Sequence, residues 1–159
     1  MTSPAVAGGG ILGVGVITAG TAYAAGAFTS KYLDFEDYVK SNDLVYAGDI
    51  PDANENSIKK LLDKDKNDYR NRLSGKWTSM PQSVKKGTDT VTKPNGDIST
   101  LFQPVSGSTT LAESTKIAEF TKAWCESKKG KVSEENETWT KDTLKKDSDW
   151  QIFEEVCLV

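Results

Sequence analysis

Two cysteines are the residues of this chain whose chemistry is easiest to name. Cys125 and Cys157 form neither a CxxC motif nor a spacing typical of zinc ligands. Outside the cytoplasm they can pair, and the closed loop would contribute about 3–4 kcal/mol in the chain-entropy model. In the reducing cytoplasm each would instead be a small core hydrophobe, beside Trp124 and Val156. A disulfide and two buried free thiols are equally compatible with the sequence.

Other patterns that could carry catalysis are weak. The chain has no histidine, which removes the commonest general base and the commonest metal ligand. The acidic pairs Glu134-Glu135 and Glu154-Glu155 would suggest a two-carboxylate hydrolase only if carboxylates faced each other across a cleft. Neighbours on a helix point apart, so we expect solvated surface groups. We therefore expect no catalytic residue, no metal ligand and no cofactor site, and we interpret the chain as not an enzyme.

Three glycines near the N-terminus have the spacing of a dinucleotide-binding fingerprint. Gly8, Gly10 and Gly13 fit G-x-G-x-x-G, and Asp34 lies about 20 residues further on. That chemistry requires a strand before the glycines and alternating strands and helices after them. Only seven residues precede Gly8 and no such alternation follows Asp34. We interpret the match as a coincidence.

The first thirty residues, here called the leader, contain no Asp, Glu, Lys or Arg, while the remainder holds all 20 basic and 23 acidic residues. Residues 4–28 would span about 37 Å as a helix, enough for a hydrocarbon layer of roughly 30 Å. The sequence therefore predicts a transmembrane helix or signal anchor at residues 4–28, in contact with membrane lipid. The net acidic flank after Lys31 favours an N-in, C-out orientation.

Cleavage of the leader is the alternative. Ala22-Tyr23-Ala24 and Ala25-Gly26-Ala27 both have the small-x-small form that a signal peptidase accepts. No Lys or Arg precedes the apolar run, however, so the basic region of a signal peptide is missing. We favour an anchor over a cleaved signal peptide on this ground.

Residues 31–159 are predicted to form one soluble, mainly helical domain. A helix is expected over residues 52–73, where Asp52 would cap it, Glu55 would complete a capping box and Gly75 would end it. Apolar residues on one face of this helix support the assignment.

Further helices are expected towards the C-terminus. One would open at a capping box that starts at Thr110 and close at Gly130, and another would open at a capping box that starts at Ser148. We expect a further helical stretch within residues 132–146, and residues 32–41 would form one or two helical turns. The expected core anchors are the largest apolar side chains: Trp124, Trp139, Trp150 and Phe153.

The middle of this domain, residues 74–108, is expected to be loop-rich because Gly and Pro punctuate it every few residues. Asn95-Gly96 is a strong two-residue turn signal, and the flanks 88–92 and 98–102 alternate weakly, which favours a short β-hairpin. A long surface loop is the other interpretation.

The net charge of −3 argues against a nucleic-acid partner, which would require a clustered basic face. The lysines do pair up in sequence, for example at Lys128-Lys129 and Lys145-Lys146, but each pair lies among acidic residues. Such mixed charge is typical of a solvated surface.

The layout of the chain resembles a known family. The resemblance rests on the uncharged leader, KYLDFEDYVKSNDLV after it, KIAEFTKAWC further on and DSDWQIFEEVCL near the end. Together these segments are similar to the paralogous surface proteins of haemotropic mycoplasmas, over essentially the full length. The members of that family are uncharacterised and are usually interpreted as membrane-anchored. The resemblance therefore implies a location and carries over no catalytic residue.

These observations predict a single-pass protein of a bacterial cell membrane, with its C-terminal domain extracellular. Its role would be interaction or antigenic display at the surface, without catalysis, towards a host or protein partner that the sequence does not identify. The alternative is a secreted protein or enzyme released by signal-peptide cleavage. A third interpretation is an intracellular scaffold with a glycine-rich tail.

Overall fold

The computed structural model describes residues 30–135 and 138–159. The chain divides into two compact units, Met1–Lys31 and Tyr32–Val159, and the second is here called the body. The predicted membrane helix at residues 4–28 lies outside the described residues. Within the described ranges, no helix has both the length and the apolar composition of a membrane span.

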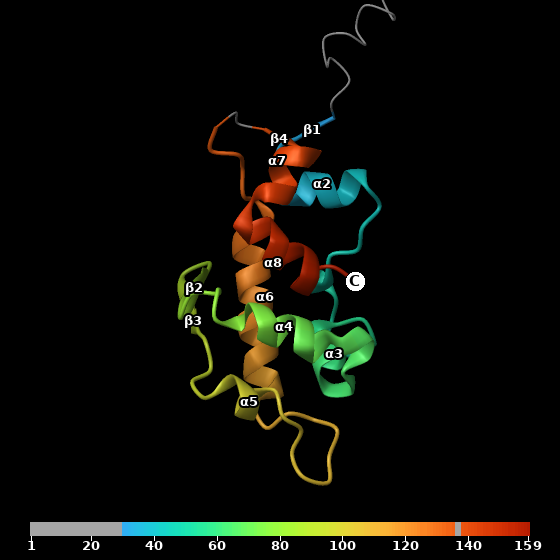
Figure 1. The fold of residues 1–159 in the computed structure, drawn as a ribbon, viewed down its shortest axis with the longest axis vertical. Coiled ribbons are helices and arrows are strands. Elements are labelled where there is room, and N and C mark those ends of the chain that lie inside the picture. The colour runs from blue at the N-terminus through green and yellow to red at the C-terminus, as the bar shows by residue number, and fades with distance from the viewer. Residues whose placement is uncertain (1–29, 136–137) are drawn as a thin grey trace, which may run out of the picture. The chain divides into compact units, whose positions relative to one another are not determined.

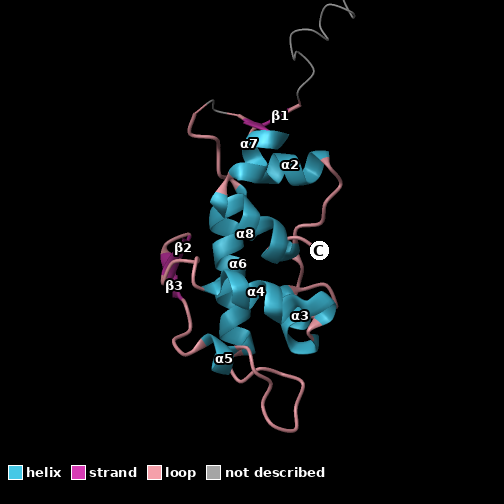
Figure 2. Ribbon diagram, in the orientation of Figure 1, coloured by secondary structure: helices cyan, strands magenta, loops and turns pink. Residues whose placement is uncertain are grey.

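Helices make up most of the regular structure of the body (Figure 2), which confirms the prediction of a mainly helical domain. Among the described residues the strands pair as β1 with β4 and β2 with β3. The helices are α2 (Phe35–Ser41), α3 (Ile58–Lys64), α4 (Tyr69–Trp77), α5 (Ile98–Leu101), α6 (Ser114–Lys129), α7 (Lys141–Lys146) and α8 (Ser148–Val156), with 3-10 turns at Ala47–Asp49 and Lys66–Asp68. The strands are β1 (Lys31–Tyr32), β2 (Ser83–Lys86), β3 (Asp89–Thr92) and β4 (Trp139–Thr140).

Helix α6 is the centre of the body, and α3, α8 and the β2–β3 hairpin pack against it (Figure 1). Ile117, Phe120 and Trp124 recur at helical spacing along it and are fully buried. Because these large side chains share one stripe, the helix can bury that stripe against several elements at once. The helix stops at Gly130, as the sequence predicted.

The start of α6 differs from the prediction. The helix begins at Ser114, and Glu113 is its N-cap residue without a side-chain cap bond. The hydroxyl of Thr110 instead lies 2.8 Å from the hydroxyl of Ser108. The capping box predicted at Thr110 is therefore wrong, because a local turn uses that hydroxyl.

The single helix predicted over residues 52–73 is two helices with a kink between them. Asp65, Asn67 and Asp68 have φ values of 49°, 56° and 58°, a left-handed conformation that Asp and Asn tolerate better than most residues. Arg70 stabilises the kink, because its Nε donates to the Leu62 carbonyl at 2.6 Å. Apolar periodicity continues across the kink, so the sequence pattern does not reveal it.

The predicted ends of that helix were also wrong. Ser57, and not Asp52, caps α3, because its Oγ accepts a hydrogen bond from the Lys60 amide at 3.2 Å. Glu55 forms an exposed ion pair with Lys64 and completes no capping box. Gly75 lies inside α4.

The middle segment does contain a hairpin, but at another place. Strands β2 and β3 pair antiparallel across a Gly87-Thr88 turn, and Gly87 has a φ of +62° that suits the first position of a two-residue hairpin turn. Residues 98–102 form no strand, because Ile98–Leu101 is α5. Pro94 precedes the expected Asn95-Gly96 turn and has no amide hydrogen for a strand ladder.

Aromatic side chains from α2, β4 and α8 form the densest part of the core. The Phe35 ring lies 5.0 Å from Trp150, 5.4 Å from Phe153 and 5.7 Å from Trp139, centroid to centroid. Trp124 is also buried, so all four predicted core anchors are confirmed. Their packing brings the N-terminal and C-terminal parts of the body together.

Helix α8 begins at Ser148, as expected, but Asp147 caps it. The Asp147 Oδ1 accepts a hydrogen bond from the Trp150 amide at 2.9 Å. The capping box predicted from Ser148 is therefore wrong, because Asp147 is the N-cap residue and Trp150, at the third helical position, has no side-chain acceptor to complete a box. The cap fixes the direction in which α8 carries Trp150 and Phe153 into the core.

Candidate functional site

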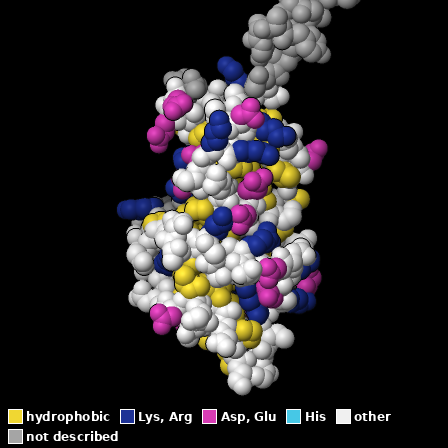
Figure 3. Space-filling view, in the orientation of Figure 1, with side chains coloured by type: hydrophobic (Ala, Val, Ile, Leu, Met, Phe, Trp, Pro, Cys, Tyr) yellow, Lys and Arg dark blue, Asp and Glu magenta, His cyan; other side chains and the backbone are white. Residues whose placement is uncertain are grey.

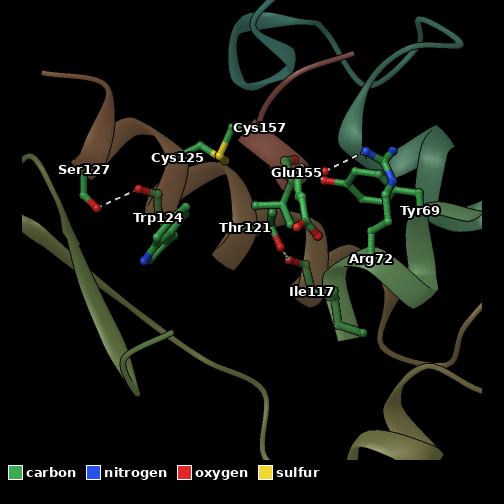
Figure 4. The surroundings of a disulfide bond; sticks show 10 residues. Tyr69, Arg72, Ile117, Thr121, Trp124, Cys125, Ser127, Glu155 and Cys157 are labelled. Atoms are coloured by element: carbon green, nitrogen blue, oxygen red, sulfur yellow. Dashed lines mark hydrogen bonds between the residues drawn. A yellow bond between two sulfur atoms is a disulfide. The ribbon is translucent and has the colours of Figure 1, made fainter. Parts of the chain in front are cut away.

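The two cysteines lie together where α6 meets the end of α8 (Figure 4). Cys125 and Cys157 are joined by a disulfide, with their Cα atoms 5.7 Å apart. Cys125 belongs to the buried stripe of α6, and Cys157 is the C-cap residue of α8. Both are fully buried. A thiol or other reductant therefore has no open path to either sulfur, and the bond acts as a crosslink.

Main-chain hydrogen bonds hold Cys157 in position. Its amide donates to the Phe153 carbonyl at 2.8 Å, and its carbonyl accepts from the Ala47 amide at 2.8 Å. The Val159 amide then donates to the Val45 carbonyl at 3.0 Å. The last residues thus form a short extended pairing with the segment after α2, which sets the second sulfur beside α6.

Helix α4 braces the same junction from the other side (Figure 4). The Tyr69 hydroxyl donates to the Val156 carbonyl at 2.5 Å, and Arg72 Nη1 donates to the Glu155 carbonyl at 2.8 Å. The Arg72 guanidinium lies 5.3 Å from the centre of the Tyr69 ring. Burial raises the pKa of Tyr69 far above its usual value. This phenol is therefore a structural hydrogen-bond donor and no acid or base at neutral pH.

A charged cleft of about 500 Å³ lies at the C-terminal end of α6. Lys131 Nζ lies 2.7 Å from Asp147 and 2.9 Å from Asp149, and Lys128 Nζ lies 2.8 Å from Asp149. Burial alone would raise the pKa of Asp149, but its bonds to the two lysines hold that pKa below the usual value. Each of these lysines already has a carboxylate partner, so an anionic ligand would have to displace one.

The acidic pairs form no catalytic arrangement in the described part of the chain. Glu134 and Glu135 are exposed on the loop before β4, and Glu154 is exposed on α8. Glu155 pairs with Lys76 at 2.9 Å. Among the described residues, no group of three or more potential ligands could hold a metal ion.

Lys93 was not predicted as a site residue, and its amino group is buried beside the end of α4. Its Nζ donates to the carbonyls of Trp77 and Met80 and lies 5.1 Å from the centre of the Trp77 ring. Burial lowers the pKa of this lysine. A lysine in a Gly- and Pro-rich segment is expected at the surface, so nothing in the sequence indicates this position.

The remaining sequence patterns fall outside the described residues. The glycine pattern at Gly8, Gly10 and Gly13 belongs to the leader, so the structure does not bear on it. What the structure does describe is a crosslinked helical body whose polar groups mostly brace main-chain carbonyls or pair with one another. This arrangement can present a fixed surface. Comparison with protein-family models, with curated proteins and with solved structures gives no match to this chain.

Proposed function

We propose that this chain is a membrane-anchored protein with an extracellular body that serves interaction or antigenic display, without catalysis. The Cys125–Cys157 disulfide carries the proposal, because disulfides form and persist in oxidising compartments. A body that closes such a bond, behind a leader without any charged residue, fits a chain whose leader stays in the membrane. The resemblance to haemotropic mycoplasma surface proteins agrees with this location.

A loop at one end of the body supports the display role. Residues 103–110 are all exposed and carry no charge. An isolated β-bridge between Pro104 and Leu111 closes this loop, and Arg70 donates to the Thr109 carbonyl. Figure 1 places it, ahead of α6, at the opposite end of the body from β1. An exposed loop with a fixed base can vary in sequence without disturbing the core.

Trypsin treatment of intact cells tests the location. The first thirty residues contain no Lys or Arg, whereas the remainder holds 20. We expect the body to be digested from outside, leaving an undigested fragment of residues 1–31 in the membrane fraction, while a cytoplasmic marker stays intact. Recovery of the whole chain in the soluble cytosol, with both thiols free to alkylation, would contradict the proposal.

N-terminal sequencing separates the anchor from the secreted alternative. A mature chain that begins at Ala25 or Phe28 and appears in the medium would show cleavage after one of the small-x-small sites. An intact N-terminus in the membrane fraction supports the anchor.

A further inference from the structure

The chain enters the body at one end, and an anchoring leader would tether that end to the membrane. Tyr32 is the first residue of the body, and it belongs to β1. Strand β1 pairs with β4, and α7 begins at the residue after β4. The chain therefore enters the body at the end that carries β1, β4 and α7 (Figure 1).

Two apolar side chains at this end are left in solvent. Leu33 directly follows β1 and is 64% exposed, and Val132 is 54% exposed, the two highest values among the large hydrophobic residues described. Val132 follows Lys131, whose carbonyl accepts a hydrogen bond from the Trp139 indole of β4 at 2.9 Å. Both side chains thus flank the β1–β4 pair, although the core needs neither of them.

Helix α7 adds positive charge at the same end. Leu144 is fully buried, which orients the helix, and Lys141, Lys145 and Lys146 are exposed. None of these three, here called the α7 lysines, has an ion-pair partner among residues 30–135 and 138–159. The nearby lysines at the end of α6, in contrast, all form ion pairs with carboxylates. Figure 3 shows the mixture of blue lysines, magenta carboxylates and yellow apolar groups on one face of the body.

Nearby carboxylates reduce the positive electrostatic potential that the α7 lysines produce. Asp142 lies on α7 itself, and Glu134 and Glu135 line a shallow hollow together with Lys146. Three lysines opposed in this way would not hold a free protein at a membrane. A tether changes the situation, because it converts binding into an intramolecular step at high effective concentration.

We propose that this end of the body rests on the bilayer, with the α7 lysines on anionic lipid headgroups and Leu33 and Val132 in the headgroup region. The inference rests on the proposed membrane anchoring and names the surface that the anchored body presents to lipid. Lysines near an anionic surface are attracted to it, and exposed aliphatic groups enter its apolar boundary. The uncharged loop at residues 103–110 then points away from the membrane, where a partner can reach it.

Amine labelling of the full chain in vesicles tests this inference. The chain is reconstituted in phosphatidylcholine alone, or with about one third phosphatidylglycerol, and labelling at each lysine is quantified by mass spectrometry. We expect labelling of the α7 lysines to fall at least about threefold in the anionic vesicles and to recover in about 0.5 M salt, where charges are screened within a few ångströms. Lys85 and Lys86 on β2 are exposed and have no ion pair in the described structure, so their labelling should not change.

Matched variants separate charge from position. Lys141→Gln, Lys145→Gln and Lys146→Gln together should raise the labelling of Lys31 in anionic vesicles, because the body lifts away. Lys60→Gln, Lys85→Gln and Lys86→Gln remove the same charge elsewhere and should leave it unchanged. Equal labelling of the α7 lysines in both vesicle types, with the chain floating in both, would overturn the inference alone. Failure to float with phosphatidylcholine would instead contradict the anchoring itself.

Discussion

The C-terminal segment and the middle segment of the body are stabilised in different ways. Residues 147–159 include six buried positions, among them the fully buried Trp150 and Phe153. The much longer stretch 81–112 has only four: Val84, Lys93, Leu101 and Leu111. The position of the C-terminal segment is therefore determined by the packing of its large apolar side chains. The middle segment has too few apolar groups for that and must be held by other means.

Backbone conformation and buried cations hold the middle segment. Gly87, Gly96 and Gly107 have φ values of 62°, 142° and 78°, which few other residues adopt without strain. Lys93 and Arg70 donate to main-chain carbonyls at the base of the segment. Val91, Ile98 and Phe102 also pack against the core while only partly buried, whereas residues 103–110 are exposed.

The largest effect should come from the aromatic core. Trp150→Ala removes a fully buried ring that contacts Phe35 and Tyr38 and should lower the free energy of unfolding by about 3–5 kcal/mol. Urea denaturation followed by circular dichroism measures it. Val105→Ala is the control in the other segment, since Val105 is 45% exposed and should change stability by no more than about 0.5 kcal/mol. Equal losses would remove the proposed contrast.

Removal of the crosslink should have the next largest effect. Cys125→Ala with Cys157→Ala opens a loop with a sequence separation of 32 residues, which corresponds to about 3–4 kcal/mol of chain entropy. We expect the free energy of unfolding, measured by urea denaturation, to fall by that amount relative to the oxidised chain. Because both sulfurs are buried, the native chain should also resist a reductant until it unfolds. Rapid reduction under native conditions would show that α8 opens locally.

The sequence predicted the aromatic core better than the kink and the hairpin for a physical reason. Large apolar groups at helical spacing identify Trp124 and Trp150 as core residues, because nothing else in a polar domain can fill that volume. The kink at Asp65 and Asn67 leaves apolar periodicity intact, so a pattern search continues through it. The same holds for the candidate site. The two cysteines could be identified from their residue type, whereas the burial of Lys93 depends on contacts between segments that are distant in the sequence.

The hairpin shows how local signals compete. Asn95-Gly96 is the stronger turn signal, yet the chain turns at Gly87-Thr88. Val84 of β2 is buried, and the hairpin packs on α6, so tertiary burial selects the strands. Pro94 then ends the ladder after Lys93, whose amide donates to the Gln82 carbonyl at 2.8 Å.

Replacement of the buried lysine tests whether the middle segment depends on its carbonyl contacts. Lys93→Met keeps the apolar stem but removes the donor to the Trp77 and Met80 carbonyls, of which the Trp77 carbonyl keeps a bond from the Met80 amide at 3.3 Å. A buried acceptor left without a partner costs about 1–3 kcal/mol. We expect a loss of that size in urea denaturation. Lys85→Met, on the exposed face of the hairpin, is the matched control and should change stability little. A neutral Lys93→Met would mean that the stem, and not the charge, holds the segment.

The smallest effect on stability should come from a substitution in the hairpin turn, where only the backbone angle φ of the glycine matters. Gly87 has a φ of +62° and a Cβ added there meets no atom within 4 Å. Gly87→Ala should therefore cost about 1–2 kcal/mol through backbone strain and not through a clash. Gly130 is equally open but has a φ of −90°, so Gly130→Ala should be neutral or slightly stabilising.

Hydrogen exchange decides whether that strain is local. If the middle segment opens as its own unit, Gly87→Ala should accelerate amide exchange in β2 and β3 while exchange in α6 and α8 stays unchanged. If the body unfolds only as a whole, exchange should accelerate in all four elements by the same factor. The second outcome would contradict the separation drawn between the two segments, because a turn at the surface would then be coupled directly to the aromatic core.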